Sequence, residues 1–303
     1  MKISVYITSF NKIKYIEKSI LSVLSQTLSP YEILIVDDAS TDGSKDLIQS
    51  FANKYPTIIK PIYNKNNLGI AKSRNIALNN ISGDVITYLD ADDYFYPNKL
   101  ENEYNQLIKF PDIDIVYSNF DYIDEAGNLL GPFASLHDKP AIGNIFINTF
   151  IRNYNIESGR NYIYEMFYKN CVFDVGLYDT KLQIWEDWDL RIRMSKQFKY
   201  GYCSTKHSVY RQLPNSLHTK EHEIHYTENI KIYNKNKNLM KDLRKEEITY
   251  IRNRIFSKIK NLFISIINKK SFFISILYGL HFIYIFKTRK SISLAYKSLF
   301  KNG

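Results

Sequence analysis

One stretch of the sequence decides the fold: Val85-Ile86-Thr87-Tyr88-Leu89-Asp90-Ala91-Asp92-Asp93. Its first five residues are mostly β-branched or aromatic, which predicts a buried strand, and three carboxylates follow where that strand ends. Clustered carboxylates in a folded protein need a cation, a hydrogen-bond donor or a proton. At the carboxyl end of a strand in an open α/β sheet a ligand usually fills the crevice, and hard oxygen ligands suit Mg²⁺ or Mn²⁺. The alternative is an acidic turn that faces solvent.

Around this stretch, predicted strands alternate with helices of about a dozen residues. The alternation predicts right-handed βαβ units, and so an α/β fold whose mainly parallel, mixed sheet is flanked by helices. Residues 125–128 indicate the turn of a small hairpin, whereas residues 130–170 indicate only short elements and loops. The predicted strands are 3–8, 32–36, 58–63, 85–89 and 113–118, with short strands at 200–203 and 208–211.

The positive charge of the chain is concentrated in its last part. The 303 residues have a formal net charge of +10, yet residues 1–219 hold 23 basic and 25 acidic residues, against 18 and 6 in residues 220–303. After Glu247 eleven basic residues follow and no acidic one. This contrast predicts an α/β domain over 1–219 and a basic, partly apolar helical region over 220–303.

Two apolar blocks, 262–267 and 271–286, lie between basic clusters of the C-terminal region. The second block has sixteen uncharged residues, fewer than the roughly 20 that a membrane-spanning helix needs. Basic flanks around an aromatic centre favour a helix on the surface of an anionic membrane. The alternative is a helical pair packed on the first domain or on a second subunit, as in a homodimer. We expect no nucleic-acid partner, because no recognisable binding module accompanies the charge.

Cys171 and Cys203 are far apart and have no His or Cys at metal-ligand spacing. We expect two free thiols in a reducing cytosol, with a single disulfide as the alternative. The amino terminus begins with strand-like alternation and shows neither an apolar h-region nor a small-residue cleavage site, so no export signal is expected. Together with the basic region, this predicts a cytoplasmic protein bound peripherally at the inner face of the plasma membrane.

Five stretches within about the first 220 residues resemble the family 2 glycosyltransferases, in the order and spacing of that family. They are Ser4–Asn11, Val36–Gly43, Asn67–Asn75, Tyr88–Asp93 and Trp185–Leu190. One acidic turn would be a weak signal, whereas five motifs in register make a specific one. The resemblance implies the Rossmann-like, nucleotide-sugar-binding fold called GT-A, and the transfer of a sugar from a nucleotide donor.

The resemblance also implies a donor pocket. Asp38 would accept a hydrogen bond from uracil or another base, with Thr8 and Asn11 in the same pocket. Arg74 would lie against the base and the diphosphate, where a guanidinium can make paired contacts to phosphate oxygens. Two alternatives come from the residues themselves: Asp37 and Asp38 could cap the next helix, and Arg74 could be an exposed helix residue.

Asp90 and Asp92 match the DxD element of the family. The resemblance implies that Asp92 ligates a Mn²⁺ or Mg²⁺ ion that bridges the diphosphate, and that Asp90 contacts the ribose or a metal-bound water. Asp93 could instead cap the turn that follows. Arg211 and His218 lie in a stretch that loosely resembles the loop closing over the diphosphate, so either could reach a phosphate or the metal. The alternative for His218, as for His207, is an ordinary polar residue.

The second acidic cluster contains Glu186 and Asp187, and Asp187 resembles the general base of the family. In an inverting transfer, the acceptor hydroxyl attacks opposite the departing nucleotide diphosphate and loses its proton as the bond forms. A carboxylate within hydrogen-bond reach of that hydroxyl lowers the barrier, and the metal neutralises the leaving group. The alternative is a helix N-terminus that favours negative charge, which is compatible with catalysis.

These expectations describe an inverting, metal-dependent glycosyltransferase. It would move a sugar from a nucleotide donor to a carbohydrate or lipid-linked acceptor, and the donor that we expect is a UDP-sugar. The expected setting is the assembly of bacterial surface polysaccharide or glycan. A nucleotidyltransferase is a second enzymatic alternative, but it would usually have a Gly-rich phosphate loop near its start, and residues 4–11 contain no glycine. The non-enzymatic alternative is a membrane-docked scaffold with an inactive transferase fold, against which the intact carboxylates argue.

Overall fold

The computed structural model describes residues 1–134, 140–152, 164–214, 221–267, 278 and 280. The strands of these residues are β1 (Ile3–Ser9), β2 (Glu32–Asp37), β3 (Ile59–Tyr63), β4 (Val85–Asp90), β5 (Tyr94–Phe95), β6 (Ile115–Ile123), β7 (Leu129–Pro132), β8 (Met166–Tyr168) and β9 (Tyr200–Arg211). The helices are α1 (Ile16–Leu24), α2 (Ser44–Lys54), α3 (Ile70–Asn80), α4 (Lys99–Lys109), α5 (Phe146–Ile151), α6 (Lys169–Phe173), α7 (Glu186–Gln197), α8 (His222–Asn236), the 3-10 helix η2 (Lys237–Met240) and α9 (Lys245–Ile267).

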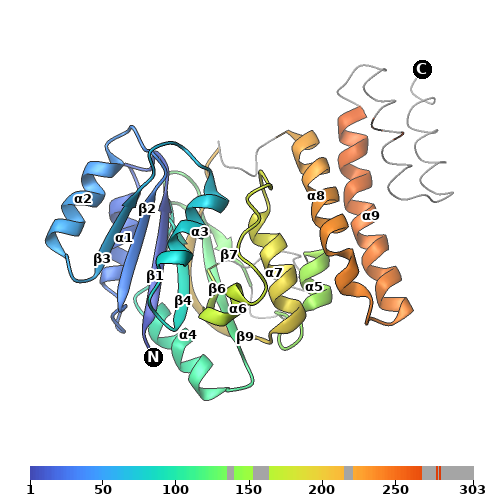
Figure 1. The fold of residues 1–303 in the computed structure, drawn as a ribbon, viewed down its shortest axis with the longest axis horizontal. Coiled ribbons are helices and arrows are strands. Elements are labelled where there is room, and N and C mark those ends of the chain that lie inside the picture. The colour runs from blue at the N-terminus through green and yellow to red at the C-terminus, as the bar shows by residue number, and fades with distance from the viewer. Residues whose placement is uncertain (135–139, 153–163, 215–220, 268–277, 279, 281–303) are drawn as a thin grey trace. The chain divides into compact units, whose positions relative to one another are not determined.

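The described strands form one mixed sheet in the order β3-β2-β1-β4-β8-β6-β9-β5, with β7 paired to β6. Strands β3, β2, β1 and β4 run parallel, whereas β8 is antiparallel to both of its neighbours. Helices flank this sheet (Figure 1), and nearly every residue of β1, β2 and β4 is buried. The α/β fold with a mainly parallel sheet, predicted from the alternation of elements, is confirmed.

The parallel strands bring several of the polar motifs to one edge of the sheet. Thr8 of β1 is in register with both Val36 of β2 and Asp90 of β4, and Ser9 is in register with Asp37. The carboxyl ends of these three strands therefore meet, which is where ligands bind in open α/β sheets.

Strand β9 corrects one prediction. The short strands predicted at 200–203 and 208–211 are parts of one continuous strand. Its register with β6 shifts, so that Cys203 and Lys206 pair with consecutive residues of β6. Residues 204 and 205 have no partner on β6 and form a bulge, and residues 204–206 are exposed. These polar residues interrupt the apolar pattern, which is why the sequence indicated two strands.

The chain divides into two compact units. The first contains Met1–Lys181 and Glu186–Pro214, and therefore the whole described sheet. The second contains Leu182–Trp185 and the described residues from 221 onward, in which α8 packs against α9. The buried stripe of α9 repeats every four residues, as in a helix with one apolar face: Ile251, Ile255, Ile259 and Phe263.

Several predictions concern the second unit. Over the described residues, none of the helices combines the length and the apolar character that crossing a membrane requires. The apolar block at 262–267 forms the end of α9, whereas nearly all of the block at 271–286 lies outside the described residues. The division into 1–219 and 220–303, and contact with a membrane or a second subunit, stay predictions. Both cysteines are free, as predicted, and both are buried.

Candidate functional site

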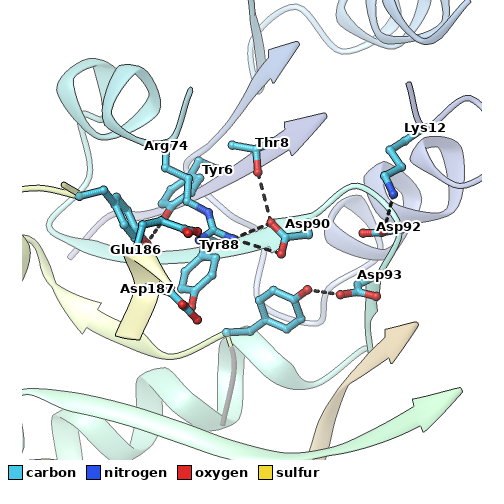
Figure 2. Close-up of polar contacts among 12 residues, drawn as sticks. Tyr6, Thr8, Lys12, Arg74, Tyr88, Asp90, Asp92, Asp93, Glu186 and Asp187 are labelled. Carbon is cyan, nitrogen blue, oxygen red and sulfur yellow. Dashed lines mark hydrogen bonds and ion pairs between the residues drawn. The ribbon is translucent and has the colours of Figure 1, made fainter. Parts of the chain in front are cut away.

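The acidic stretch lies at the carboxyl end of β4, as Figure 2 shows. Asp90 is the last residue of the strand, and Thr8 of the neighbouring β1 donates its hydroxyl to Asp90 Oδ1 at 3.2 Å. Asp92 follows in the next turn, where Lys12 Nζ lies 2.6 Å from its Oδ2. The side chains of Asp90 and Asp92 are 30% and 18% exposed, so a ligand at the sheet edge can reach both carboxylates.

Arg74 of α3 connects this strand end to the second acidic cluster (Figure 2). Its Nη2 contacts both carboxylate oxygens of Asp90, at 2.9 and 3.1 Å, and its Nη1 contacts Glu186 Oε1 at 2.8 Å. The residue is 5% exposed, so the alternative of an exposed helix residue is wrong. A single buried guanidinium therefore holds together two motifs that are 96 positions apart in the chain.

Aromatic rings surround the Arg74 guanidinium. The ring centroids of Tyr88 and Tyr178 lie 5.3 and 5.4 Å from its Cζ, a geometry in which the ring faces attract the cation. Tyr6 stacks on Tyr88 with centroids 5.4 Å apart. Burial alone would lower the pKa of Arg74, but the charges of Asp90 and Glu186 outweigh it and raise that pKa, so the guanidinium stays charged.

Asp38 directly follows β2, is 4% exposed and binds the backbone that leads into α3. Its carboxylate accepts hydrogen bonds from the backbone N–H of Leu68 and of Gly69, both at 2.8 Å, and from the Asn64 side chain at 2.7 Å. Asp38 therefore supports the start of α3. The capping alternative expected it to support α2, the helix after the 37–44 loop, and is wrong for this residue. A contact of Asp38 with a base stays a prediction.

Asn11 and Lys12 lie in a loop that is hydrogen-bonded to the loop after β2. Asn11 has a left-handed φ of 52°, accepts the N–H of Thr41 at its side-chain oxygen, and donates its own N–H to Ser40. This side chain therefore orders two loops, and its predicted contact with the donor stays a prediction. Lys12 was not among the predicted site residues, and the same loop directs its ammonium to Asp92.

Asp93 was expected to cap the turn that follows β4. Its side chain is instead buried, with 2% of the residue exposed, and binds other parts of the chain. Its carboxylate accepts hydrogen bonds from the Arg211 N–H at 2.6 Å and from the Tyr164 hydroxyl. Burial and the neighbouring charge of Asp92 raise its pKa well above the usual range. Arg211 donates to the carbonyl oxygens of Asp92, Asp124 and Glu125, and a contact with phosphate or metal stays a prediction. His218 lies outside the described residues.

Glu186 and Asp187 begin α7, where negative charge is favoured. Glu186 is buried against Arg74, whereas the Asp187 side chain is 29% exposed. Burial raises the pKa of Glu186 to about 7, against the lowering effect of Arg74, and the nearby Asp187 charge adds to the rise. Asp187 Oδ2 contacts Arg191 Nη1 at 2.7 Å. Asp187 is thus the more accessible carboxylate and Glu186 the one tied to Arg74.

Acidic groups outnumber basic ones among the described residues of this site. Glu165 belongs to this site because it pairs with Arg191 at 2.8 Å. The acidic residues are Asp90, Asp92, Asp93, Glu165, Glu186 and Asp187, and the basic residues are Lys12, Arg74, Arg191 and Arg211. An excess of clustered carboxylates favours protonation or the binding of a cation. No group of three or more metal-ligating side chains occurs in the part of the chain that the structure describes, so a cation here would take some of its ligands from a bound substrate.

The raised pKa of Glu186 predicts a pH-dependent stability that a Glu186→Gln variant lacks. The ordinary pKa of 4.5 applies in the unfolded chain and about 7 in the folded one, so the folded state binds the proton more tightly. Wild-type stability therefore falls relative to the variant as the pH rises from about 5 to 8, by about 2 kcal/mol. Urea denaturation at four pH values measures this difference. If the free energies of unfolding of the two proteins changed in parallel with pH, the raised pKa of Glu186 would be wrong.

A known protein family matches more than half of the chain. The family model described as "Glycosyl transferase family 2" matches residues 4–167. An uncharacterized glycosyltransferase of Methanocaldococcus jannaschii is 30% identical over 209 residues, which are 65% of this chain and 66% of that protein. An uncharacterized glycosyltransferase of Nostoc sp. is 40% identical over 124 residues, 41% of this chain and 38% of that protein, so the match spans less than half of this relative's length.

Solved structures resemble the chain over nearly its whole length. The crystal structure of S. aureus TarS 1–349 in complex with UDP-GlcNAc has a TM-score of 0.70 and 17% identity, and the match covers 99% of this chain and 90% of that one. The mannosyltransferase PcManGT from Pyrobaculum calidifontis, in complex with GDP-Man and Mn²⁺, has a TM-score of 0.58 and 14% identity, with 100% and 88% covered. At 17% and 14% sequence identity, the similarity to these two structures shows that the fold is shared.

Proposed function

The chain belongs to glycosyl transferase family 2 and has the GT-A fold, and from this premise we propose that it is an inverting, metal-dependent glycosyltransferase that uses a UDP-sugar. The observation that carries the proposal is the Arg74 bridge between Asp90 and Glu186. Through this bridge, carboxylates suited to a leaving diphosphate lie in one site with carboxylates suited to an acceptor hydroxyl. An inverting transfer needs both kinds of group, on opposite sides of the reacting carbon.

The residues at the end of β4 fit a divalent cation. Asp90 and Asp92 offer hard carboxylate oxygens that are partly exposed, and each is balanced by a single basic side chain, Arg74 or Lys12. Mg²⁺ and Mn²⁺ sites commonly use one or two carboxylates together with substrate phosphates. When bound, the cation would supply positive charge to the departing diphosphate. Lys12 would then leave Asp92 and could pair with a phosphate oxygen.

Asp187 is proposed as the general base. Its side chain is partly exposed at the start of α7, whereas Glu186 is buried and paired with Arg74. A base must reach the acceptor hydroxyl, which favours the exposed carboxylate. Glu186 then acts through Arg74, by keeping the guanidinium between the two halves of the site.

The nucleotide and the acceptor class rest on similar proteins. S. aureus TarS has been solved with UDP and with UDP-GlcNAc, and PcManGT with GDP-Man and Mn²⁺, which supports a nucleotide-sugar donor. Similar chains include a protein of Borreliella burgdorferi named cholesterol galactosyltransferase, 37% identical over 119 residues. We propose a carbohydrate or lipid-linked acceptor in bacterial glycan assembly, with the basic residues of the second unit near a membrane surface.

Transfer assays with a panel of UDP-sugars test the proposed function. We expect release of UDP that depends on Mn²⁺ or Mg²⁺ and increases when an extract of bacterial glycans or lipids supplies the acceptor. The anomeric proton coupling of the product, read by NMR, should report the configuration opposite to that of the donor. A product with the donor's configuration would exclude the inverting mechanism, and absence of turnover with every nucleotide sugar would favour the scaffold alternative.

A further inference from the structure

Arg191 of α7 has no place in the function proposed so far, although it contacts the proposed base. The residue is 3% exposed, and its guanidinium makes short contacts on several sides. Nη1 lies 2.7 Å from Asp187 Oδ2. Nε and Nη2 contact the two carboxylate oxygens of Glu165 at 2.8 and 3.0 Å, which is a paired, geometrically specific arrangement. A flexible lysine could not reproduce this fixed fork.

Tyr88 connects this cluster to β4. Its hydroxyl accepts from Arg191 Nη2 at 2.6 Å and donates to Glu165 Oε2 at 3.0 Å. Tyr88 is two residues before Asp90 on β4, and its ring also faces the Arg74 guanidinium. The strand that ends in the proposed metal ligand Asp90 therefore also determines where Arg191 lies.

We infer that Arg191 is a positioning residue that takes its place from β4, through Tyr88 and Glu165, and orients Asp187 toward the acceptor hydroxyl. This inference rests on the proposed function of Asp187. The guanidinium is shared by Glu165 and Asp187, so it restrains one Asp187 oxygen without cancelling the negative charge of both carboxylates. Because β4 anchors Arg74 as well, one strand sets the separation between the donor side and the acceptor side of the site.

Arg193, two residues further along α7, provides a matched comparison. It pairs with Asp189 Oδ2 at 2.9 Å, with the same four-residue spacing as the Arg191–Asp187 pair. Asp189 is fully buried, and the rest of the Arg193 guanidinium binds backbone carbonyl groups, among them those of Val175 and Leu177. Arg193 therefore anchors α7 to the preceding loop. Its loss should affect folding and leave the reaction of folded molecules unchanged.

The test uses a pair of substitutions, because Arg191→Met alone leaves Glu165 buried without its cationic partner. The double variant Arg191→Met/Glu165→Gln removes both the positive charge of Arg191 and the negative charge of Glu165. Its glutamine oxygen can still accept a hydrogen bond from the Tyr88 hydroxyl. We expect kcat, corrected for the folded fraction, to fall about 10- to 100-fold, while the Kd for UDP in the presence of Mn²⁺ stays within about twofold. Arg193→Met should lower the melting temperature and leave the corrected kcat unchanged.

The outcomes separate this inference from the function on which it rests. If the folded double variant keeps the wild-type kcat, or loses kcat only together with UDP binding, Arg191 does not position the base. Asp187→Asn, assayed in parallel, reports on the base itself. A large loss with Asp187→Asn and none with the double variant would overturn only the role of Arg191. No loss with Asp187→Asn would overturn the assignment of the base.

Discussion

Replacing Asp187 with asparagine is expected to lower kcat about a thousandfold while UDP binding stays within about twofold. Asparagine keeps the shape of the side chain and its contact with Arg191 through an oxygen, but it cannot take up the proton of the acceptor hydroxyl. The groups proposed to bind the donor, Asp90 and Asp92, lie on β4 and the turn after it, and the substitution leaves them intact. Initial rates with saturating donor, together with calorimetric titration of UDP, separate the two effects.

Asp189→Asn is the control for this substitution. Asp189 lies half a turn further along α7, is fully buried and pairs with Arg193. Its loss should lower the melting temperature without a comparable loss of kcat in the folded molecules. Near-normal turnover of Asp187→Asn would show that another group takes the proton, and Glu186 would then be the first to examine.

Replacing Arg74 with methionine has the largest effect expected on stability, about 3–5 kcal/mol. The substitution leaves Asp90 and Glu186 without the buried cation that both contact. UDP binding should also be lost, because the guanidinium holds Asp90 at the strand end. Chemical denaturation measures the first effect, and calorimetry on the variant at low temperature, where it is still folded, measures the second.

Two further variants make this prediction specific. Lys72→Met removes an exposed positive charge from the same helix and should change stability by no more than about 0.5 kcal/mol. Adding Glu186→Gln to Arg74→Met should restore part of the lost stability, because one of the two uncompensated carboxylates becomes neutral. If Arg74→Met were as stable as Lys72→Met, the contacts of Arg74 with Asp90 and Glu186 would contribute nothing to stability. The proposal that Arg74 holds the two acidic clusters in one site would then be wrong.

Local patterns predicted most of the elements that form the site. The apolar run before Asp90 predicted β4, and the alternation of strands with helices predicted a parallel sheet whose carboxyl ends meet. The position of the first acidic cluster at this edge therefore followed from the sequence, whereas the second cluster was expected only at the start of a helix. Family resemblance added roles to Asp92 and Asp187 that spacing alone does not contain, and those roles stay predictions.

The contacts between distant motifs could not be predicted in this way. Arg74 lies on a helix of mostly polar and small residues, so nothing local indicates that it is buried, and its partner Glu186 is 112 positions away. Glu165 lies in the part of the chain, 130–170, whose pattern indicated only short elements. Lys12 follows a strand in an ordinary polar loop, and only the fold directs it to Asp92. Such pairs depend on tertiary structure, which periodicity does not report.

The most direct test of the proposed donor site is calorimetric titration of the full chain with UDP, with and without Mn²⁺, alongside the Asp92→Ala variant. We expect UDP to bind the wild-type protein tightly only when Mn²⁺ is present, and the variant to lose this binding while it keeps its fold. Equal binding of UDP by the wild type and by Asp92→Ala, or no binding of UDP with Mn²⁺ present, would contradict a metal-dependent UDP-sugar site at the end of β4.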